Sequence, residues 1–570
     1  MNLNSHFRKL LAACFCYLVS MPAFSQDTFW DDNANTAWYT GKSNSYTIST
    51  ATDLAGLAIL VNGGNTFSSD TIKLGADIDL SAHKWVPIGT GWDLVFKGCF
   101  DGKGYKIKGL KIDGSKNQGY RWFGFFSSIS AVAGDSIVIK NILFSSENES
   151  KIEVESESSA PVDFIGTLIG YTNNRGGKIL IEQCENEINV SGGKGTDSSI
   201  SGGLIGLVAS NTENGISIIN CSNSGNITGS TFSEMSYTGG LIGNCSYLEK
   251  SGTMTRLINC HNNGNVTGGG TIWSYTGGVI GTNEAANLYR CSNQGNVTSG
   301  ANASSTGGLI GNYTCMNETD ISDCYNSGNV IGGGNSPTAL NYVGGLIGTA
   351  YNNKELDFRT VNIISCYNSG NVSRRSETAT SNIGGLIGLN FNVNISNCFV
   401  AAMAIESLDN DNVGRFIGNN IGNVPSIDNY AYVENMFSDN NDFINGLDWT
   451  GLMTSAPVNL WDPDVWIIDP TSQVLPKLRA DDPDIPNPKY DETSNEVLGF
   501  EGVSVYATPG FAVISYTGDL QLSSDISVYS YDGSLLAKQR IKTGTTTIPL
   551  QKGLYIIVVN NKFYKISVRN

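Results

Sequence analysis

The hexapeptide Thr238-Gly-Gly-Leu-Ile-Gly243 is repeated without change from Thr306 to Gly311, and its Gly-Gly-(Leu/Val)-Ile-Gly part occurs six times. The first glycines of these six copies are Gly202, Gly239, Gly277, Gly307, Gly344 and Gly384. Two degenerate copies begin at Gly166 and Gly414, and consecutive copies lie 30 to 40 residues apart. A repeat of this length is typical of a solenoid, a propeller or another array of stacked units.

A second phrase, Asn-Cys-x-Asn-x-Gly-Asn-Val or a close variant, lies between consecutive copies. Its cysteines are Cys184, Cys221, Cys260, Cys291, Cys324, Cys366 and Cys398. Equivalent residues on stacked units point the same way, which is poor geometry for a disulfide, whereas a buried cysteine behaves as a small apolar residue. We therefore predict a column of free thiols in the core.

Each repeat offers three short extended pieces: Gly-Gly-Leu-Ile-Gly, Ile-x-Asn-Cys and Gly-Asn-Val. Between them stand Asn, Gly and Ser, which tolerate the positive φ of sharp corners. This predicts an all-β fold, a right-handed parallel β-helix with rungs about 4.8 Å apart. Asparagines two and five residues after each cysteine should stack as ladders. A propeller is the alternative, but its blades need more residues.

The rest of the chain is divided by changes in composition. Residues 26–45 form a polar and aromatic lead-in, and the β-helix is expected over 46–420. Thr50 or Thr52 can cap a short helix that closes the first end of the solenoid, with an apolar face of Leu54, Leu57, Ala58 and Val61. We expect an aromatic-rich cap over 421–480, an acidic, proline-rich linker over 481–497 and a small antiparallel β-sandwich over 498–570, with a hairpin turn at Asp532-Gly533.

The first 25 residues are typical of an export signal. Arg8 and Lys9 precede an apolar run from Leu10 to Phe24, and cleavage is expected between Ser25 and Gln26. Lipidation at Cys14 is the alternative. The sequence thus predicts a protein exported to the cell surface, the outer membrane or the medium, without a transmembrane helix, because no apolar run is long enough.

Composition and motifs argue against several classes of function. The formal charge of −17 and the lack of a basic stripe exclude a nucleic-acid partner. Neither His83 nor His261 has metal-ligand spacing, and we expect no cofactor. Two acidic clusters, Asp409-Asn-Asp411 and Asp439 to Asp442, are candidate ligands for calcium. The regular repeat positions hold no clustered carboxylates, so we predict no catalysis.

Five aromatic residues lie in the segments just before the glycine pairs: Phe232, Tyr237, Trp273, Tyr275 and Tyr342. If they share one face, they form a strip on which sugar rings can stack. Alternatively, they only cover the corner of the coil. The sequence therefore predicts an adhesin or binding scaffold for glycans or for host and matrix surface proteins. A polysaccharide lyase or glycoside hydrolase and a glycan-capture protein for nutrient uptake are the alternatives.

The two phrases resemble those of the GLUG-motif proteins, bacterial surface proteins in which Gly-Gly-Leu-Ile-Gly repeats build a β-helix. Residues 46–112 are similar to the opening of that family, with Asp77-Ile-Asp-Leu and Trp85-Val-Pro-Ile-Gly. Some members carry a metallopeptidase domain that attacks immunoglobulin A, but this chain has no His-Glu-x-x-His. Residues 498–570 resemble the type A sorting domain of type nine secretion, except at Tyr506-Ala-Thr-Pro. This resemblance implies secretion machinery as a partner.

Overall fold

In a computed structural model, the chain forms two compact units, residues 1–481 and 482–570. The structure describes residues 28–114, 121–154, 161–210, 215–247, 255–300, 303–315, 319–334, 340–352, 361–375, 381–406, 411–421, 429–432, 445–447, 458, 461–468, 475–479, 503–508, 511–516, 525–530, 535–540, 544–551, 553–559 and 562–568. The predicted cleavage at Ser25 and Gln26, the lipidation at Cys14, the linker 481–497 and the turn Asp532-Gly533 lie outside these residues.

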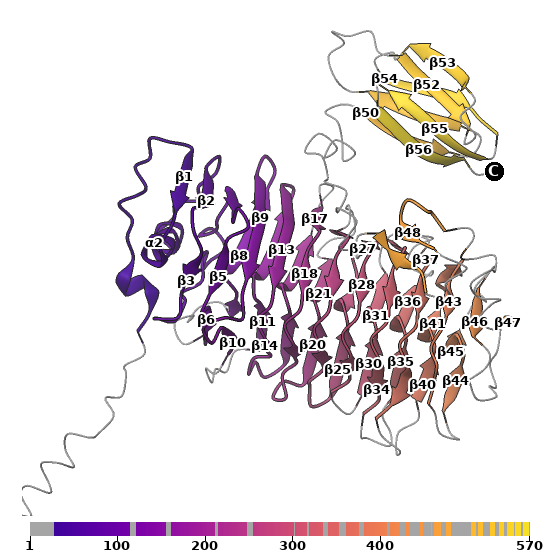
Figure 1. Ribbon diagram of the computed structural model, residues 1–570, viewed down its shortest axis with the longest axis horizontal. Helices are drawn as coiled ribbons and strands as arrows, with labels where there is room; N and C mark the ends of the chain where they lie inside the picture. Colours follow the sequence, from indigo (N-terminus) through magenta and orange to yellow (C-terminus); the bar gives the residue numbers. More distant parts are fainter. Residues whose placement is uncertain are drawn as a thin grey trace, which may run out of the picture. The chain divides into compact units, whose positions relative to one another are not determined.

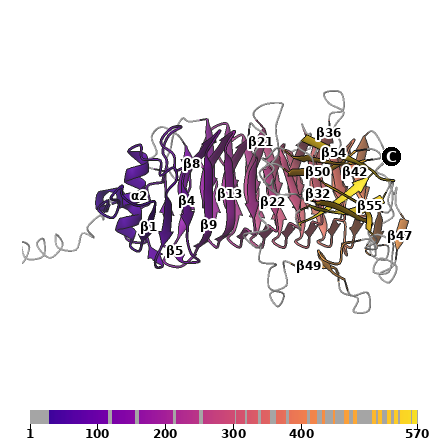
Figure 2. The ribbon, with the colours of Figure 1, turned by 90° about the horizontal axis from the view of Figure 1, so that it is seen from above.

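The first unit is a parallel β-helix, as predicted (Figure 1). One complete turn consists of β15 (Ser198–Gly202), β16 (Ile205–Ser210), β17 (Ile216–Ile219), β18 (Ser222–Asn223) and β19 (Ile227–Thr228). Each strand pairs in parallel with its equivalents in neighbouring repeats, so the turns stack as successive rungs (Figure 2). The first sheet has 21 strands and holds two strands per regular rung, and the second has eight.

The third and fourth sheets have nine strands each. The third contains β7 (Trp122–Phe123), β11 (Val162–Gly166), β15, β20 (Met235–Gly239), β25 (Trp273–Gly277), β30 (Ala303–Gly307), β35 (Asn341–Gly344), β40 (Ser381–Gly384) and β44 (Asn412–Gly414). The fourth contains β8 (Phe126–Val132), β12 (Ile169–Arg175), β16, β21 (Ile242–Tyr247), β26 (Ile280–Asn283), β31 (Ile310–Cys315), β36 (Ile347–Asn352), β41 (Ile387–Phe391) and β45 (Ile417–Ile421).

The expectation of three extended pieces per repeat needs correction, because a regular rung has five short strands. Gly-Gly-Leu-Ile-Gly is a corner rather than one strand: the third sheet ends at its first glycine, and the fourth begins at its isoleucine. A Cβ on Gly239 would lie 1.9 Å from the Ile242 carbonyl oxygen, and one on Gly240 would lie 2.0 Å from the Gly278 carbonyl oxygen. The glycine pair is therefore required by close approach of the backbone.

The seven repeat cysteines form the predicted column. All are buried and free, with side chains 0% exposed. Along the column, the Cys291 amide donates to the Cys324 sulfur at 3.4 Å, and the Cys324 amide donates to the Cys366 sulfur at 3.4 Å. Burial raises the pKa of the Cys291 and Cys324 thiols well above the usual value. Of the other cysteines with described side chains, Cys99 and Cys245 are also free.

Two asparagine ladders accompany the thiols, as predicted. In the buried ladder, Asn262 Nδ2 donates to Asn293 Oδ1, and Asn293 Nδ2 to Asn326 Oδ1, each at 2.7 Å. In the exposed ladder the side chain accepts from the backbone instead: the Asn296 amide donates to Asn265 Oδ1 at 3.0 Å. Both ladders supply partners to polar groups at the corners.

A column of left-handed residues, seven of which directly precede the repeat cysteines, was not predicted. At one position of each rung, between two strands of the first sheet or inside β9 (Ser136–Phe144) and β13 (Lys178–Asn186), a non-glycine residue has φ between 51° and 57°. The column comprises Lys103, Asn141, Gln183, Asn220, Asn259, Arg290, Asp323, Ser365 and Asn397. Asn and Asp occupy five of these positions, as expected from their tolerance of this conformation.

The helix α2 (Ala51–Asn62) closes the first end of the solenoid, as expected (Figure 2). Thr50 is its N-cap, because the Thr50 hydroxyl accepts from the Asp53 amide at 3.2 Å. The predicted face of Leu54, Leu57, Ala58 and Val61 is buried. In the first sheet β1 (Ser45–Ile48) pairs in parallel with β2 (Thr71–Leu74), where the stack of rungs begins.

The far end differs from the sequence prediction. Strands β46 (Tyr430–Tyr432) and β47 (Asn445–Leu447) continue the first sheet beyond residue 420. Three later parts of the expected cap, residue 458 and residues 461–468 and 475–479, lie along the flank of the first sheet rather than over its end. There Trp461 and Trp466 pack against a stack formed by Tyr325, Tyr367 and Phe399. We call residue 458 and residues 461–468 and 475–479 together the strap; Trp449 lies outside the described residues.

The second unit contains two antiparallel sheets, which agrees with the predicted β-sandwich. The first consists of β50 (Val503–Thr508), β51 (Phe511–Tyr516) and β54 (Gly544–Pro549). The second consists of β52 (Asp525–Ser530), β53 (Leu535–Arg540), β55 (Gly553–Val559) and β56 (Lys562–Val568). Ile526, Val528 and Ile557 are fully buried in it. Across the described parts of both units, no helix has the length and apolar character needed to cross a bilayer.

Candidate functional site

Two rows of outward side chains run along the third and fourth sheets, one residue per rung. The row on the third sheet stands two residues before each first glycine and comprises Trp122, Phe164, Ile200, Tyr237, Tyr275, Ser305, Tyr342, Asn382 and Asn412. The row on the fourth sheet comprises Ser128, Tyr171, Leu207, Asn244, Thr282, Asn312, Thr349, Leu389 and Asn419.

The two rows meet across the glycine corner. The rings of Phe164 and Tyr171 lie 5.7 Å apart, and Ser305 Oγ lies 2.7 Å from Thr349 Oγ1. We call this surface the outer corner. Its first half is mostly aromatic and aliphatic, with Ser128 and Asn244 as polar members, and its second half is mostly polar. A surface that places flat rings beside polar groups is suited to binding a ligand with both apolar and hydroxyl-bearing faces.

The structure brings three of the five predicted aromatics together. Tyr237 and Tyr275 stack with ring centroids 5.2 Å apart and planes inclined by 23°. Trp273 lies parallel to Tyr275, with centroids 6.1 Å apart, and all three side chains are half-buried. Tyr342 is two rungs from Tyr275, with Ser305 between them.

The fifth predicted aromatic, Phe232, is not in a row. It follows β19, is 64% exposed, and has the Lys194 ammonium 5.5 Å from its ring centroid. The cation and the ring attract each other at this distance. Phe232 is therefore separate from the cluster of Tyr237, Trp273 and Tyr275.

The tyrosine hydroxyls of the outer corner stay neutral near pH 7. Burial raises the pKa of Tyr237 to about 12 and also raises the pKa of Tyr275 and of Tyr342. A neutral phenol can both donate and accept a hydrogen bond. These rings can therefore offer a polar edge as well as an apolar face to a ligand.

Two polar atoms in the facing row have no hydrogen-bond partner among the described residues. They are Asn244 Oδ1 and Thr282 Oγ1, both buried. Asn244 stands on the rung of Tyr237, and Thr282 stands on the rung of Tyr275. An unpaired buried polar atom is costly to a folded chain unless water or a ligand satisfies it. Because both atoms are shielded from solvent, a ligand hydroxyl reaches them only when a covering side chain moves.

Sequence reasoning missed the aromatic residues of the first rungs. Trp122, Phe164 and Tyr171 belong to the rows, and Trp92 packs on two of them. Phe164 and Tyr171 flank the degenerate copy Gly166–Gly170, and Trp92 and Trp122 precede it, where the alignment of equivalent positions is weakest. The signal was present at Phe164, which stands two residues before Gly166 as Tyr237 stands before Gly239.

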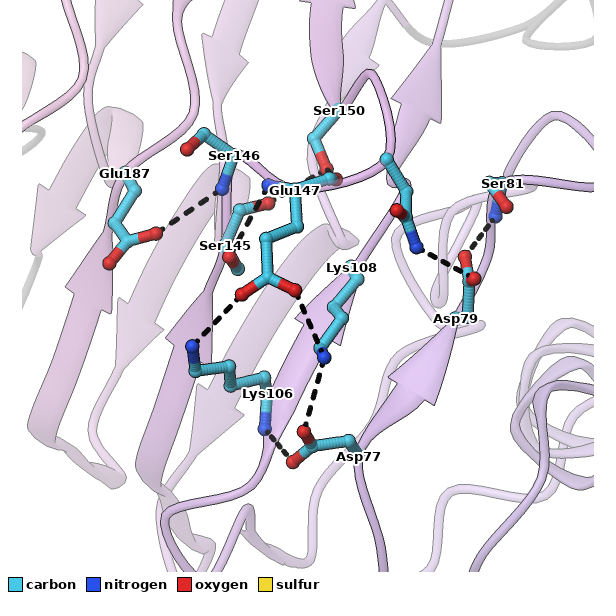
Figure 3. Close-up of polar contacts among 11 residues, drawn as sticks. Asp77, Asp79, Ser81, Lys106, Lys108, Ser145, Ser146, Glu147, Ser150 and Glu187 are labelled. Atoms are coloured by element: carbon cyan, nitrogen blue, oxygen red, sulfur yellow. Dashed lines mark hydrogen bonds and ion pairs between the residues drawn. The ribbon is translucent and has the colours of Figure 1, made fainter.

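A separate polar cluster lies at the first rungs of the first sheet (Figure 3). Glu147 accepts from Lys106 Nζ and pairs with Lys108 Nζ, each at 3.0 Å, and Lys108 also lies 3.4 Å from Asp77 Oδ2. Beside them, Asp79 accepts from Asn148 Nδ2 at 2.7 Å and from the Ser81 amide at 2.9 Å.

The charges of this cluster match an ion-pair network better than an acid–base pair. Hydrogen bonds from Lys106 and Lys108 lower the pKa of Glu147, and the bond from the Lys106 amide lowers that of Asp77. The bond to Glu147 raises the pKa of Lys108. The carboxylates therefore stay ionised and the amine protonated near pH 7, whereas a general acid needs a raised carboxyl pKa. The network ties β3 (Ile78–Asp79) and β5 (Lys106–Lys108) to the turn that follows β9 (Ser136–Phe144).

The remaining candidate ligands are engaged in other contacts. His83 Nδ1 lies 2.5 Å from Thr28 Oγ1, and His261 Nδ1 lies 2.9 Å from Ser292 Oγ. In the first calcium candidate, Asp411 is buried and pairs with Arg374 Nη1 at 2.6 Å. Asp409 and Asp439 to Asp442 lie outside the described residues, and within the described ones no three His, Cys, Asp or Glu side chains form a metal-binding group.

No protein-family model matches this chain, and no curated protein matches it. Among solved structures, it is similar to one named "putative immunoglobulin A1 protease from Bacteroides ovatus". The two chains are 16% identical, and the match covers 77% of this chain and 93% of the other, with a TM-score of 0.33. A likeness at this level carries no argument about activity.

Proposed function

We propose that this chain is an exported, non-catalytic surface protein that binds glycans through the outer corner around Tyr237 and Tyr275. The observation that carries the proposal is the half-buried stack of these two rings, 5.2 Å apart, beside the unpaired Asn244 Oδ1 and Thr282 Oγ1. The flat C–H face of a sugar packs on an aromatic ring, and its hydroxyls need hydrogen-bond partners. Glycans on host or matrix proteins present both features.

The regular rungs support binding of an extended glycan. Neighbouring rungs of a sheet are about 4.8 Å apart, so equivalent side chains repeat at that distance along the surface. Tyr237 and Tyr275 occupy neighbouring rungs, and Trp273 widens the platform on the second. A linear chain of sugars can therefore contact several rungs at once, which adds affinity through many weak contacts.

The proposed location and secretion partner rest on sequence patterns. The signal-like first 25 residues support export, and the likeness of residues 498–570 to a type nine sorting domain supports secretion machinery as a partner. The repeats resemble those of GLUG-motif surface proteins. Deleting residues 498–570 should leave the protein inside the envelope, which fractionation of cells would show; release of the truncated protein in normal amount would contradict this part.

A glycan array probed with the purified protein tests the binding proposal. We expect Trp273→Ala and Tyr275→Ala each to lower binding at least tenfold while the circular dichroism spectrum stays that of the native protein. Tyr289→Ala is the matched control, because Tyr289 is half-buried on β27 (Ala286–Tyr289) of the first sheet. Equal binding by all variants would remove the proposal. Shortened glycans after incubation would favour the alternative, a carbohydrate-active enzyme.

A further inference from the structure

Trp92 lies at the first end of the outer corner. The loop from Gly89 to Val95 covers this end, and Ser128 Oγ holds it by hydrogen bonds to the carbonyl oxygens of Gly89 at 3.0 Å and Gly91 at 3.3 Å. Although its ring contacts other rings, Trp92 is 41% exposed. A large aromatic side chain that is both anchored and exposed is a common feature of binding sites.

The rings beneath Trp92 fix its orientation. Trp122 and Tyr171 stack with centroids 5.0 Å apart and planes inclined by 20°. Trp92 stands across both of them, with centroids 4.9 Å from Trp122 and 5.5 Å from Tyr171 and interplanar angles of 81° and 86°. Edge-to-face packing of this kind is favourable. Trp92 is thus held in place before any ligand arrives.

Arg175 supplies a positive charge at the same place. Its Cζ lies 5.6 Å from the centroid of the Trp92 ring. With the amide oxygen of Asn173 turned toward the guanidinium, Asn173 accepts from Nε at 3.1 Å and from Nη2 at 3.2 Å. Asn173 is only 1% exposed, so it forms a rigid support. Arg175 itself is exposed and forms no ion pair with the carboxylates in the described part of the chain.

We propose that Trp92 and Arg175 form a binding site for an acidic sugar, a pyranose ring that carries a carboxylate. The carboxylate pairs with the solvent-facing side of the Arg175 guanidinium, whose planar fork matches a carboxylate's two oxygens. The apolar face of the sugar ring packs against the exposed part of Trp92. Asn173 and the rings of Trp122 and Tyr171 act as positioning residues.

The surroundings favour a carboxylate over a neutral sugar. Although the chain carries a formal charge of −17, Arg175 forms no ion pair with any carboxylate among the described residues. Asp93 follows Trp92 and is exposed, so its charge opposes an acidic ligand to a small extent. An exposed ion pair is weakened by salt, and binding should therefore fall as ionic strength rises. The site does not depend on Tyr237 and Tyr275, which lie on later rungs.

Calorimetric titration of the full-length protein tests the site. The probes are tetragalacturonate, which carries uronic acids, 3′-sialyllactose, which carries a sialic acid, and lactose as the neutral reference. We expect at least one acidic probe to bind ten or more times more tightly than lactose. The probe that binds identifies the source of the carboxylate, and binding of neither acidic probe overturns the proposal.

Single-residue variants distinguish the effect of the Arg175 charge from an effect on the fold. Arg175→Gln should lower the affinity for the acidic probe at least tenfold, and Arg175→Lys should lower it less. Trp92→Ala should abolish binding of the probe. Asp93→Asn should strengthen binding a few-fold, and Trp273→Ala should leave it unchanged, which distinguishes this site from the one around Tyr275. Each variant must keep the melting temperature of the parent within a few degrees. Unchanged affinity in folded Arg175→Gln would also overturn the proposal.

Discussion

Tyr367 Oη donates a hydrogen bond of 2.7 Å to the Pro476 carbonyl oxygen and so joins residues that lie 109 positions apart in sequence. The bond fixes the strap to the flank of the β-helix. Around it, Trp461 donates through Nε1 to the Asn397 carbonyl oxygen at 3.0 Å, and Trp466 Nε1 donates to Asp323 Oδ1 at 2.9 Å. The strap is therefore held by directional bonds as well as by stacked rings.

Replacing Tyr367 by Phe should loosen the strap without unfolding the rungs. The ring keeps its stacking on Tyr325 and Phe399, with centroids 5.0 and 4.9 Å away. The lost hydrogen bond should cost about 1 kcal/mol of local stability. Hydrogen exchange at the Arg479 amide, which donates to the Val465 carbonyl oxygen, should become about fivefold faster. Tyr325→Phe is the control, because the Tyr325 hydroxyl accepts a hydrogen bond from Gln294 rather than bonding the strap. Equally fast hydrogen exchange in both variants would contradict the role given to the Tyr367 hydroxyl.

The strap should also respond to pH through Asp323. Burial raises the pKa of Asp323 to about 6, above its usual value of 3.8, although Trp466 opposes the rise by donating to it. The folded state then binds more protons than the open state between about pH 4 and pH 6. The strap should therefore become less stable as pH rises through this window and level off above it. Tryptophan fluorescence should report the change, and Asp323→Asn should flatten the curve.

The seven column thiols should be inert in the native protein. They are fully buried, so a reagent cannot reach their sulfur atoms in the folded protein. We expect titration with a thiol reagent at neutral pH to detect none of the seven before denaturation and all of them afterwards. Reducing agents should leave the melting temperature unchanged, because the column contains no disulfide. A fall in melting temperature on reduction would contradict this prediction.

Gly278→Ala should strongly destabilise the solenoid. A Cβ at this position would lie 2.0 Å from the Gly308 carbonyl oxygen and 2.3 Å from Asn293 Cγ, a member of the buried ladder. The backbone and the ladder must both move, at a cost of about 2 to 4 kcal/mol. Gly91→Ala is the control, because the nearest atoms to its Cβ would be Leu94 side-chain carbons at 3.6 Å. Urea denaturation measures the free energy of unfolding of both variants. A similar decrease in Gly278→Ala and Gly91→Ala would contradict this prediction.

The stacked fold could be predicted because its signal is repeated. Six of the seven cysteine phrases hold asparagine two and five residues after the cysteine, so the thiol column and both ladders follow from register alone. The left-handed column was not predicted because Lys103, Gln183 and Arg290 are residue types with no preference for a positive φ. The position of the strap was predicted wrongly because the sequence around Trp461 and Trp466 does not indicate which rungs these side chains pack on.

The outer corner was predictable only where the repeat is regular. Tyr237, Trp273 and Tyr275 could be grouped by their distance from a glycine pair. Trp92 belongs to a loop without a repeat counterpart, and its contact with Tyr171 joins residues from different elements. Pairing of this kind depends on the path of the loop, which local patterns do not encode.

The two ladders and the glycine corner give each rung the same upper and lower surface. A whole rung can therefore be added or removed by unequal recombination of the gene, and its neighbours still meet matching partners. Changes in length are thus easily tolerated, whereas a shift of one residue within a rung breaks every ladder at that level. Natural variants should differ by whole repeats of 30 to 40 residues, and the length of the β-helix should vary with the number of repeats.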